Sequence, residues 1–313
     1  MTVATYAAAQ LLRVLPRARI TRAVGRLVDA PLPAAITRTV VRVYTRAYGV
    51  DLDEAVQREG FASFDAFFTR QLRDGARPQP TDPSVVVSPA DGRIEAIGPV
   101  EKDGRFLIKG REYRADELLG DEGEARRYQG GQFAVVYLSP RDYHRVHSPV
   151  AGTIHEIRSL PGDLYPVNSI GERHVPSLFS INRRVSIPID VTGTAGEPSG
   201  RVTVVMVGAM IVGRITVSGI DERDVPMGTH RLSPPRRVGR GEEIGMFHLG
   251  STAVVFAEPG FGAEWRHGVG PVLFGESMVE PRPPGEQPRA GAATSSHASH
   301  GPSNGTAGKG RGG

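Results

Sequence analysis

The sequence predicts an α+β protein in which N-terminal amphipathic helices lie on a predominantly antiparallel β sandwich or barrel core. Three observations indicate this class. The first 50 residues have helical periodicity, the chain beyond Pro83 consists of short runs rich in Val, Ile and Thr, and glycine and proline separate those runs. With 313 residues, of which 39% are hydrophobic, the chain can bury one large core.

The composition excludes several kinds of protein. The chain has no cysteine, which rules out disulfide frameworks, thiolate nucleophiles and cysteine-bound metals. The longest uncharged apolar run, residues 202–213, is too short for a membrane-spanning helix, which needs about 20 residues. Only three residues are lysines, so enzymes that depend on a Schiff-base lysine have few candidates here.

Residues 1–50 are strongly basic, with eight arginines and a single acid, Asp29. The arginines repeat at helical spacing on two segments, as Arg19, Arg22 and Arg26 and then as Arg38, Arg42 and Arg46. Apolar residues fill the other side of each segment, so two basic amphipathic helices are predicted. Such helices either pack on the core or bind a membrane surface. Without interleaved aromatics or a known motif, no nucleic-acid partner is expected.

The rest of the chain divides into three parts. Residues 51–80 contain a connection and a core-docking helix from 61 to 77, indicated by Phe64, Phe67, Phe68 and Leu72 at helical spacing. Residues 81–279 form a β-rich catalytic domain, with strands expected at 84–87, 133–138, 201–207 and 252–256. Residues 280–313 are dense in Gly, Pro and Ser and predict a disordered tail.

The β domain contains an internal echo. Residues 88–94 and 148–154 both fit the pattern S-P-x-x-G-x-I. Each looks like a turn that feeds a strand, because proline and glycine favour turns and the pattern ends in a β-branched residue. Two related strand entries indicate a pseudo-symmetric β sandwich or barrel.

Three groups of residues could carry chemistry. Asp91 alone fits a simple Asx turn. His144 and His147 lie three apart, which suits either acid–base work or a metal site, but the zinc-peptidase pattern H-E-x-x-H is absent. Gly250 and Ser251 enter an apolar strand. Together, Asp91, His147 and Ser251 supply an orienting acid, a base and a hydroxyl nucleophile. A serine hydrolase built on these three residues and a barrel-type zinc peptidase built on His144 and His147 both stay open.

These motifs resemble the phosphatidylserine decarboxylases, membrane-associated pyruvoyl enzymes of the prokaryotic type that are made as proenzymes. The resemblance covers about residues 45 to 280, and residues 233–240 depart from the family's pattern. The stretches that carry it are LGST at 249–252, YHRVHSP at 143–149, PADG at 89–92, FDAFF at 64–68 with Arg77-Pro78, and VGAMIVG at 207–213.

The resemblance implies a self-cleaving precursor. Asp91, His147 and Ser251 would form the cleavage triad and break the bond between Gly250 and Ser251, giving a β chain of residues 1–250 and an α chain of residues 251–313. Ser251 would become a covalent pyruvoyl group that forms a Schiff base with phosphatidylserine and yields phosphatidylethanolamine and CO2. Such a carbonyl replaces pyridoxal phosphate as the electron sink, and no metal is expected. His144 is the candidate proton donor.

The lipid substrate also implies where the protein works. The N-terminal helices are expected to bind the membrane surface peripherally, on the cytoplasmic side of the cell membrane. Arginines near an anionic leaflet contribute on the order of 1 kcal/mol each, so this binding should weaken in salt. A homodimer stays open.

Overall fold

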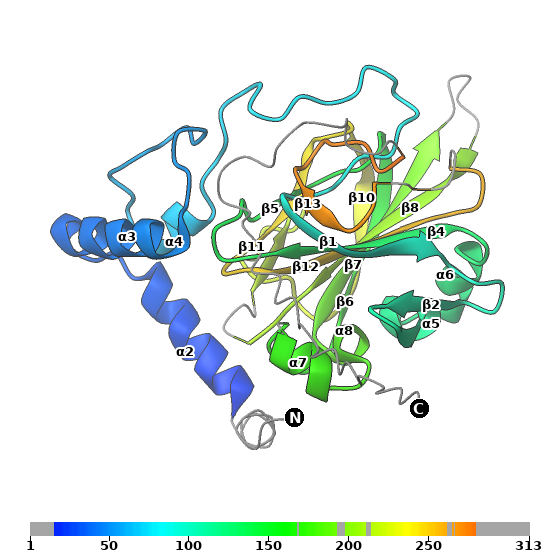
Figure 1. Ribbon diagram of the computed structural model, residues 1–313, viewed down its shortest axis with the longest axis horizontal. Helices are drawn as coiled ribbons and strands as arrows, with labels where there is room; N and C mark the ends of the chain where they lie inside the picture. Colours follow the sequence, from blue (N-terminus) through cyan, green and yellow to red (C-terminus); the bar gives the residue numbers. More distant parts are fainter. Residues whose placement is uncertain are drawn as a thin grey trace, which may run out of the picture.

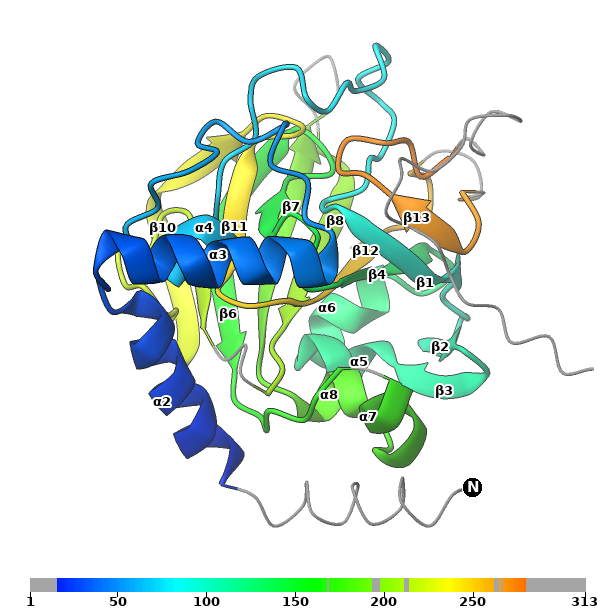
Figure 2. The ribbon, with the colours of Figure 1, turned by 60° about the vertical axis from the view of Figure 1, so that its left-hand side comes forward.

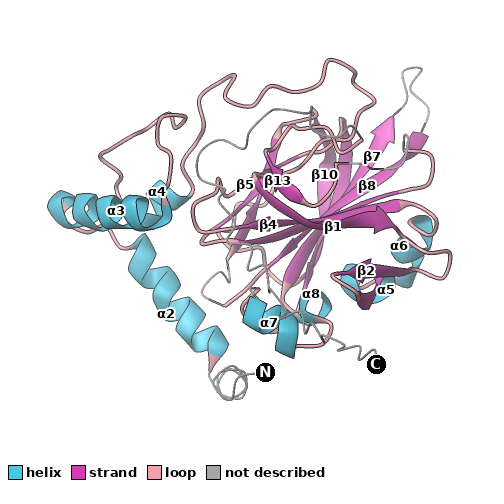
Figure 3. Cartoon of the chain, viewed as in Figure 1, coloured by secondary structure: helices cyan, strands magenta, loops and turns pink. Residues whose placement is uncertain are grey.

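The computed structural model describes residues 16–167, 169–192, 198–210, 214–261, 265 and 267–279. The N-terminal helices, within residues 17–68, lie on one side, strands make up the body of the molecule, and short helices lie along its other edges (Figure 1, Figure 3). This is the α+β architecture with a mostly antiparallel β core that the sequence predicts. The predicted disordered tail at 280–313 and the first 15 residues of the predicted basic segment lie outside the described residues.

The two predicted basic helices are present as α2 (Arg17–Asp29) and α3 (Ala34–Tyr48). Proline at positions 31 and 33 separates them, and α3 ends at Gly49, whose φ of 65° suits the left-handed helix cap. Within the described part of the chain, no helix is long and apolar enough to cross a membrane.

Helix α2 docks on the rest of the protein through a polar stripe, which is flanked by half-buried apolar residues. The stripe repeats every four residues: Arg17, Thr21, Gly25 and Asp29. Arg17 donates from Nε to Asp163 Oδ1 at 2.7 Å, and Asp29 accepts from Arg214 at 2.7 Å. Leu27, on the predicted apolar face, stays 65% exposed. The arginine face points outward, while the apolar face is half-buried at Ile20, Val24 and Val28 and exposed at Leu27.

The core-docking helix predicted from 61 to 77 is much shorter. Helix α4 spans Phe64–Phe68, and the Ser63 hydroxyl caps it by accepting from the Ala66 amide at 3.1 Å. The chain beyond α4 pairs its backbone with residues 54–56 instead, and these long-range hydrogen bonds end the helix. Helices α3 and α4 lie side by side in both views (Figure 1, Figure 2).

The β domain consists of three antiparallel sheets. The largest has eight strands in the order β10-β6-β7-β8-β12-β4-β1-β13, a second has the order β5-β11-β9, and β2 pairs with β3. The strands are β1 (Gly92–Pro99), β2 (Arg105–Ile108), β3 (Arg111–Arg114), β4 (Gln132–Leu138), β5 (Arg145–His147), β6 (Gly152–Leu160), β7 (Arg184–Thr192), β8 (Pro198–Val207), β9 (Ile215–Val217), β10 (Gly228–Val238), β11 (Glu243–Phe247), β12 (Ser251–Ala257) and β13 (Gly270–Val272). Four short helices complete the domain: α5 (Ala115–Leu119), α6 (Glu122–Arg127), α7 (Ser169–His174) and α8 (Leu178–Ile181).

Strand β12 lies at the centre of the core. It pairs with β4 on one side and β8 on the other, and all seven of its residues are buried. Burial on both faces explains why the sequence of β12 is continuously apolar rather than alternating. Ser251 is therefore the first residue of one of the most constrained strands of the protein.

The two S-P-x-x-G-x-I segments adopt the same local structure. In each, the serine hydroxyl donates to the carbonyl two residues further on, at 2.8 Å for Ser88 and 2.6 Å for Ser148. Each segment then feeds a strand, β1 in the first copy and β6 in the second. The echo in the sequence is therefore a repeated turn, as predicted.

The two turns also pair with each other across an approximate two-fold axis. The Val87 amide donates to the Pro149 carbonyl at 3.1 Å, and the His147 amide donates to the Pro89 carbonyl at 2.8 Å. This reciprocal pairing brings the segment that contains His147 against the segment that contains Asp91. The strand predicted at 84–87 is wrong, because only Val87 joins an isolated bridge while its neighbours form a loop after Pro83.

Candidate active site

The Gly250–Ser251 bond lies in a strained connection between β11 and β12. Leu249 has a φ of 101° and Gly250 a φ of 56°. A positive φ is easy for glycine but unusual for leucine, so the surroundings must hold Leu249 in place. Ser251 is 3% exposed, and its hydroxyl donates to the Val207 carbonyl. The nucleophile predicted from the sequence is thus buried, with its hydroxyl on the neighbouring strand.

His144 lies beside this connection and is fully buried. Its Nδ1 donates to the Asp142 carbonyl at 2.8 Å, and its ring packs at a tilt of 38° against Phe68, with centroids 4.0 Å apart. Its Nε2 is buried and has no hydrogen-bond partner among the described residues. A Cβ on Gly250 would lie 3.4 Å from this nitrogen. Burial, aided by the charge of Arg70, lowers the pKa of His144 to about 3. His144 is therefore neutral, with a free lone pair next to Gly250.

His147 ends β5 and is held by several neighbours. Its Nδ1 donates to the Gly241 carbonyl at 2.8 Å, and its Nε2 lies 3.2 Å from the Tyr143 hydroxyl. The imidazole is nearly parallel to the Phe274 ring, with centroids 3.9 Å apart. Burial lowers its pKa. His147 is a neutral imidazole fixed on both edges and on one face.

Asp91 belongs to the first of the two repeated turns and is buried. Arg77 donates to it from Nε at 3.0 Å and from a terminal nitrogen at 2.5 Å, and the Phe274 amide donates to it at 2.9 Å. Arg77 also pairs with Glu54 at 2.7 Å. Phe274 therefore joins the two predicted residues, since its amide binds Asp91 while its ring covers His147.

The structure brings some of the predicted residues together but does not join Ser251 to them by a hydrogen bond. Asp91 and His147 meet at Phe274, and His144 faces Gly250. Among the described residues, no hydrogen bond joins Ser251 to Asp91 or to either histidine. The roles predicted for these residues remain predictions.

Sequence reasoning did not single out several residues of this region as site residues. Arg77, Tyr143 and Phe274 hold Asp91 and His147, and Arg70 lies near His144. Arg77 and Tyr143 fall inside the motif stretches, so their presence there was a signal. The sequence around Phe274 gave no such signal, because the residues that Phe274 contacts lie more than a hundred residues away along the chain.

The described residues contain no group of three or more His, Asp or Glu side chains placed to hold a metal ion. His144 and His147 each use Nδ1 for a backbone carbonyl, and their Nε2 atoms have different surroundings. The histidine pair is arranged as two separate sites.

Comparison with known proteins places this β domain and its Gly-Ser connection in one family of enzymes. The family model described as phosphatidylserine decarboxylase matches residues 64–280. The chain is 38% identical to the phosphatidylserine decarboxylase proenzyme of Myxococcus xanthus, over 80% of this chain and 89% of the relative. It is 40% identical to the proenzyme of that name from Pseudomonas aeruginosa PAO1, over 86% of this chain and 95% of the relative. The proenzyme of Azotobacter vinelandii is 39% identical over 83% of this chain. The chain belongs to the phosphatidylserine decarboxylase family.

Proposed function

We propose that this enzyme converts phosphatidylserine to phosphatidylethanolamine and CO2 with a carbonyl group that it makes from Ser251. Membership of the family supports the reaction. The observation that carries the mechanism is the Gly250–Ser251 bond, which combines a buried serine with two consecutive positive φ angles just before it. A strained turn that ends beside the nucleophile is suited to self-cleavage.

Self-cleavage uses groups of this chain alone. The Ser251 hydroxyl gives its proton to a base, and its oxygen attacks the Gly250 carbonyl carbon. The C–N bond then breaks as the base returns the proton to the Ser251 nitrogen, so that an ester and a free amine replace the peptide bond. Loss of the Ser251 α-proton then breaks the ester and leaves Gly250 as a free carboxylate. The dehydroalanine at 251 takes up water and loses ammonia, and the new amino terminus is a pyruvoyl group. The products are chains 1–250 and 251–313.

His147 keeps the role of base that the sequence predicts, with Asp91 beside it. Both are oriented by Phe274, and the lowered pKa of His147 leaves it neutral and able to accept a proton at neutral pH. For this step the Ser251 hydroxyl must turn away from the Val207 carbonyl, since that is its present acceptor. Tyr143, which contacts His147 Nε2, would have to release that nitrogen.

The surroundings of residue 251 fit a carbonyl group. The position is buried at the start of β12, and the unpartnered Nε2 of His144 lies beside the preceding residue. A pyruvoyl group at 251 would supply a carbonyl that binds the substrate amine and takes up the electrons left when CO2 departs. Because His144 Nε2 carries no proton in this state, the role predicted for it from the sequence requires it to take up a proton during the reaction and then deliver it to the substrate carbon.

Helices α2 and α3 are the proposed membrane-binding elements. Large apolar side chains on their outer surface are exposed: Leu27 65%, Ile36 50%, Val40 41% and Val43 61%. Beside them, α3 and the loop at 52–61 enclose a cavity of about 330 Å³ whose lining includes Arg38, Arg42, Arg46 and Arg58. Apolar groups beside a cluster of arginines suit an anionic membrane surface. Binding would be peripheral, at the cytoplasmic face of the cell membrane.

The test is product formation from vesicles. The purified protein, mixed with phosphatidylserine vesicles, should release CO2 and form phosphatidylethanolamine, and prior treatment with borohydride should abolish the reaction. A protein that hydrolyses esters, is blocked by a phosphonyl inhibitor and forms no phosphatidylethanolamine would instead be a serine hydrolase.

A further inference from the structure

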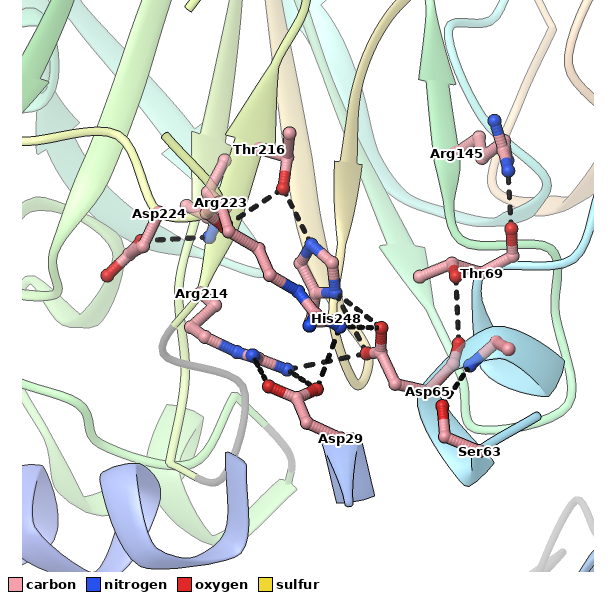
Figure 4. A network of polar contacts seen from close by, with 12 residues as sticks. Asp29, Ser63, Asp65, Thr69, Arg145, Arg214, Thr216, Arg223, Asp224 and His248 are labelled. Atoms are coloured by element: carbon pink, nitrogen blue, oxygen red, sulfur yellow. Dashed lines mark hydrogen bonds and ion pairs between the residues drawn. The ribbon is translucent and has the colours of Figure 1, made fainter. Parts of the chain in front are cut away.

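A buried hydrogen-bonded pair of a carboxylate and an imidazole lies directly before the bond that we propose is cleaved. Asp65 on α4 is 3% exposed, and His248, just after β11, is 4% exposed. His248 Nδ1 lies 2.8 Å and 3.0 Å from the two oxygens of Asp65 (Figure 4). On its other edge, Nε2 lies 2.6 Å from the hydroxyl of Thr216 on β9. The ring is thus held at both nitrogens, by groups from two other parts of the chain.

The carboxyl group of this pair is ionised. Burial acts to raise the pKa of Asp65, but the hydrogen bonds and charges of His248 and Arg223 outweigh it, and the pKa lies below its usual value. A carboxylate can only accept hydrogen bonds, so His248 Nδ1 carries the proton. The contact is a charge-assisted hydrogen bond, shielded from water, which is stronger and more directional than an exposed pair.

The position of this pair in the chain suggests its purpose. His248 directly precedes Leu249 and Gly250, the two residues with positive φ, and Ser251 follows them. Leu249 also packs against the hydrophobic cluster that contains Phe67 and Phe68 of α4. Both residues before Gly250 are therefore fixed to α4, one by charge and one by apolar contact. Surroundings of this kind are what a leucine needs to stay at a φ of 101°.

A second layer of charges connects the pair to helix α2. Arg223 donates to Asp65 at 2.6 Å and to Asp29 at 2.9 Å, while Arg214 donates to Asp29 at 2.7 Å and lies 3.4 Å from Asp65. Asp29 is the one acidic residue of the first 50. Figure 4 shows the two arginines between the carboxylates of Asp29 and Asp65.

We propose that His248 and Asp65 are positioning residues for self-cleavage, and that docking of α2 through Asp29 reinforces them. The pair holds Leu249 and Gly250 in the strained turn and so keeps the Gly250 carbonyl within reach of Ser251. Converting an amide to an ester is unfavourable, and strain in the turn that the cleavage relieves lowers the cost of that conversion. Once the bond is cut, Gly250 is a free chain end and the strain is relieved. The proposal rests on the proposed function, since it presumes that the bond is cleaved.

The pair is expected to act on cleavage and not on the later reaction with lipid. Asp65→Asn and His248→Gln keep the size of each side chain and remove the charge-assisted hydrogen bond. Each should slow conversion of precursor to two chains by roughly 10- to 100-fold, the usual effect of a small displacement of reacting groups. Decarboxylation per pyruvoyl group should stay at the level of the parent protein. The double variant should cleave no more slowly than the slower single variant, because both changes remove the same contact between Asp65 and His248.

Two further variants separate positioning from general weakening of the fold. Asp29→Asn removes the outer layer and should slow cleavage by a smaller factor than Asp65→Asn. Asp163→Asn is the matched control, because Asp163 anchors the other end of α2 through Arg17 and does not touch the pair. It should leave the cleavage rate unchanged. Thermal unfolding of each variant in a Ser251→Ala background, which cannot cleave, reports any loss of fold.

The outcomes distinguish this proposal from the proposed function. If the parent protein does not cleave, the proposed function fails. If the parent cleaves and both pair variants cleave at the same rate, the positioning role alone is wrong. Two further results would overturn the positioning role: cleavage that slows only in proportion to the fraction of unfolded protein, or equally slow cleavage in Asp163→Asn. In either case the pair would act only by stabilising the fold.

Discussion

His144 Nε2 lies 3.4 Å from the place where a Cβ on Gly250 would stand. A Cβ at 250 would be in close van der Waals contact with the buried imidazole and would also be held at a φ of 56°, which costs a residue other than glycine about 1 kcal/mol or more. We therefore expect Gly250→Ala to fold with slightly reduced stability and to cleave much more slowly. A time course of precursor conversion measures this, with Gly110→Ala as a control. Gly110 also has a positive φ, of 75°, but has nothing within 4 Å of its Cβ position. Equal rates for the two variants would mean that the contact with His144 has no effect.

The two histidines are predicted to serve different steps. His147→Ala, like Asp91→Ala and Ser251→Ala, should remain a full-length precursor, because each change removes one part of the same activation unit. His144→Ala should cleave into two chains with a titratable pyruvoyl group yet make little phosphatidylethanolamine, a loss of roughly 10²- to 10⁴-fold. Gel analysis and a lipid assay on the same preparations measure both steps. An uncleaved His144→Ala precursor would make His144 the base, in keeping with its position beside Gly250.

The buried neutral His144 makes the stability of the precursor depend on pH. Its folded pKa is about 3, below the value of about 6.5 in an unfolded chain. Between pH 3 and pH 6.5 the unfolded state therefore binds more protons than the folded state. The contribution of His144 to the free energy of unfolding is complete above about pH 6.5 and is lost as the pH falls toward 3, at about 1.4 kcal/mol per pH unit. In a Ser251→Ala background, the unfolding midpoint should fall more steeply from pH 7 to pH 4 than it does with His144→Gln added. Parallel curves for the two proteins would contradict the buried neutral state.

The exposed apolar residues of α3 are predicted to enter the membrane surface. Ile36→Ser, Val40→Ser and Val43→Ser combined should weaken binding to anionic vesicles, and raising the salt concentration should weaken binding of the parent protein. The matched control changes Leu107, Met227 and Val269 to serine, since these are also exposed apolar residues but belong to the β domain. Cosedimentation with vesicles measures binding. Equal loss in both triple variants would mean that general surface hydrophobicity, and not α3, attaches the protein.

Much of the β core and the chemistry-bearing residues could be predicted from local sequence. The repeated S-P-x-x-G-x-I turn is visible because each copy satisfies its own serine and feeds a strand, and β12 is visible as a continuous apolar run. Asp91 and His147 could be grouped in advance by their residue types and by the family resemblance, but their meeting point at Phe274 could not, because it is a long-range contact.

What the sequence could not predict depends on partners far along the chain. The polar contacts that dock α2 come from Arg17 and Asp29, whose partners lie more than 140 residues away, so local periodicity could not reveal them. The helix expected from 61 to 77 ends early because residues 54–56 compete for its backbone. The same holds for Asp65 and His248, which are 183 residues apart and each unremarkable alone.

The central claim is that active protein is cut between Gly250 and Ser251 and carries a carbonyl at the new terminus. Intact mass measurement of the purified, decarboxylating protein, before and after borohydride, tests it most directly. We predict two chains, 1–250 and 251–313, the smaller lacking a free amino group and gaining two hydrogens on reduction. A single uncut chain with Ser251 intact, in a preparation that makes phosphatidylethanolamine, would contradict the account.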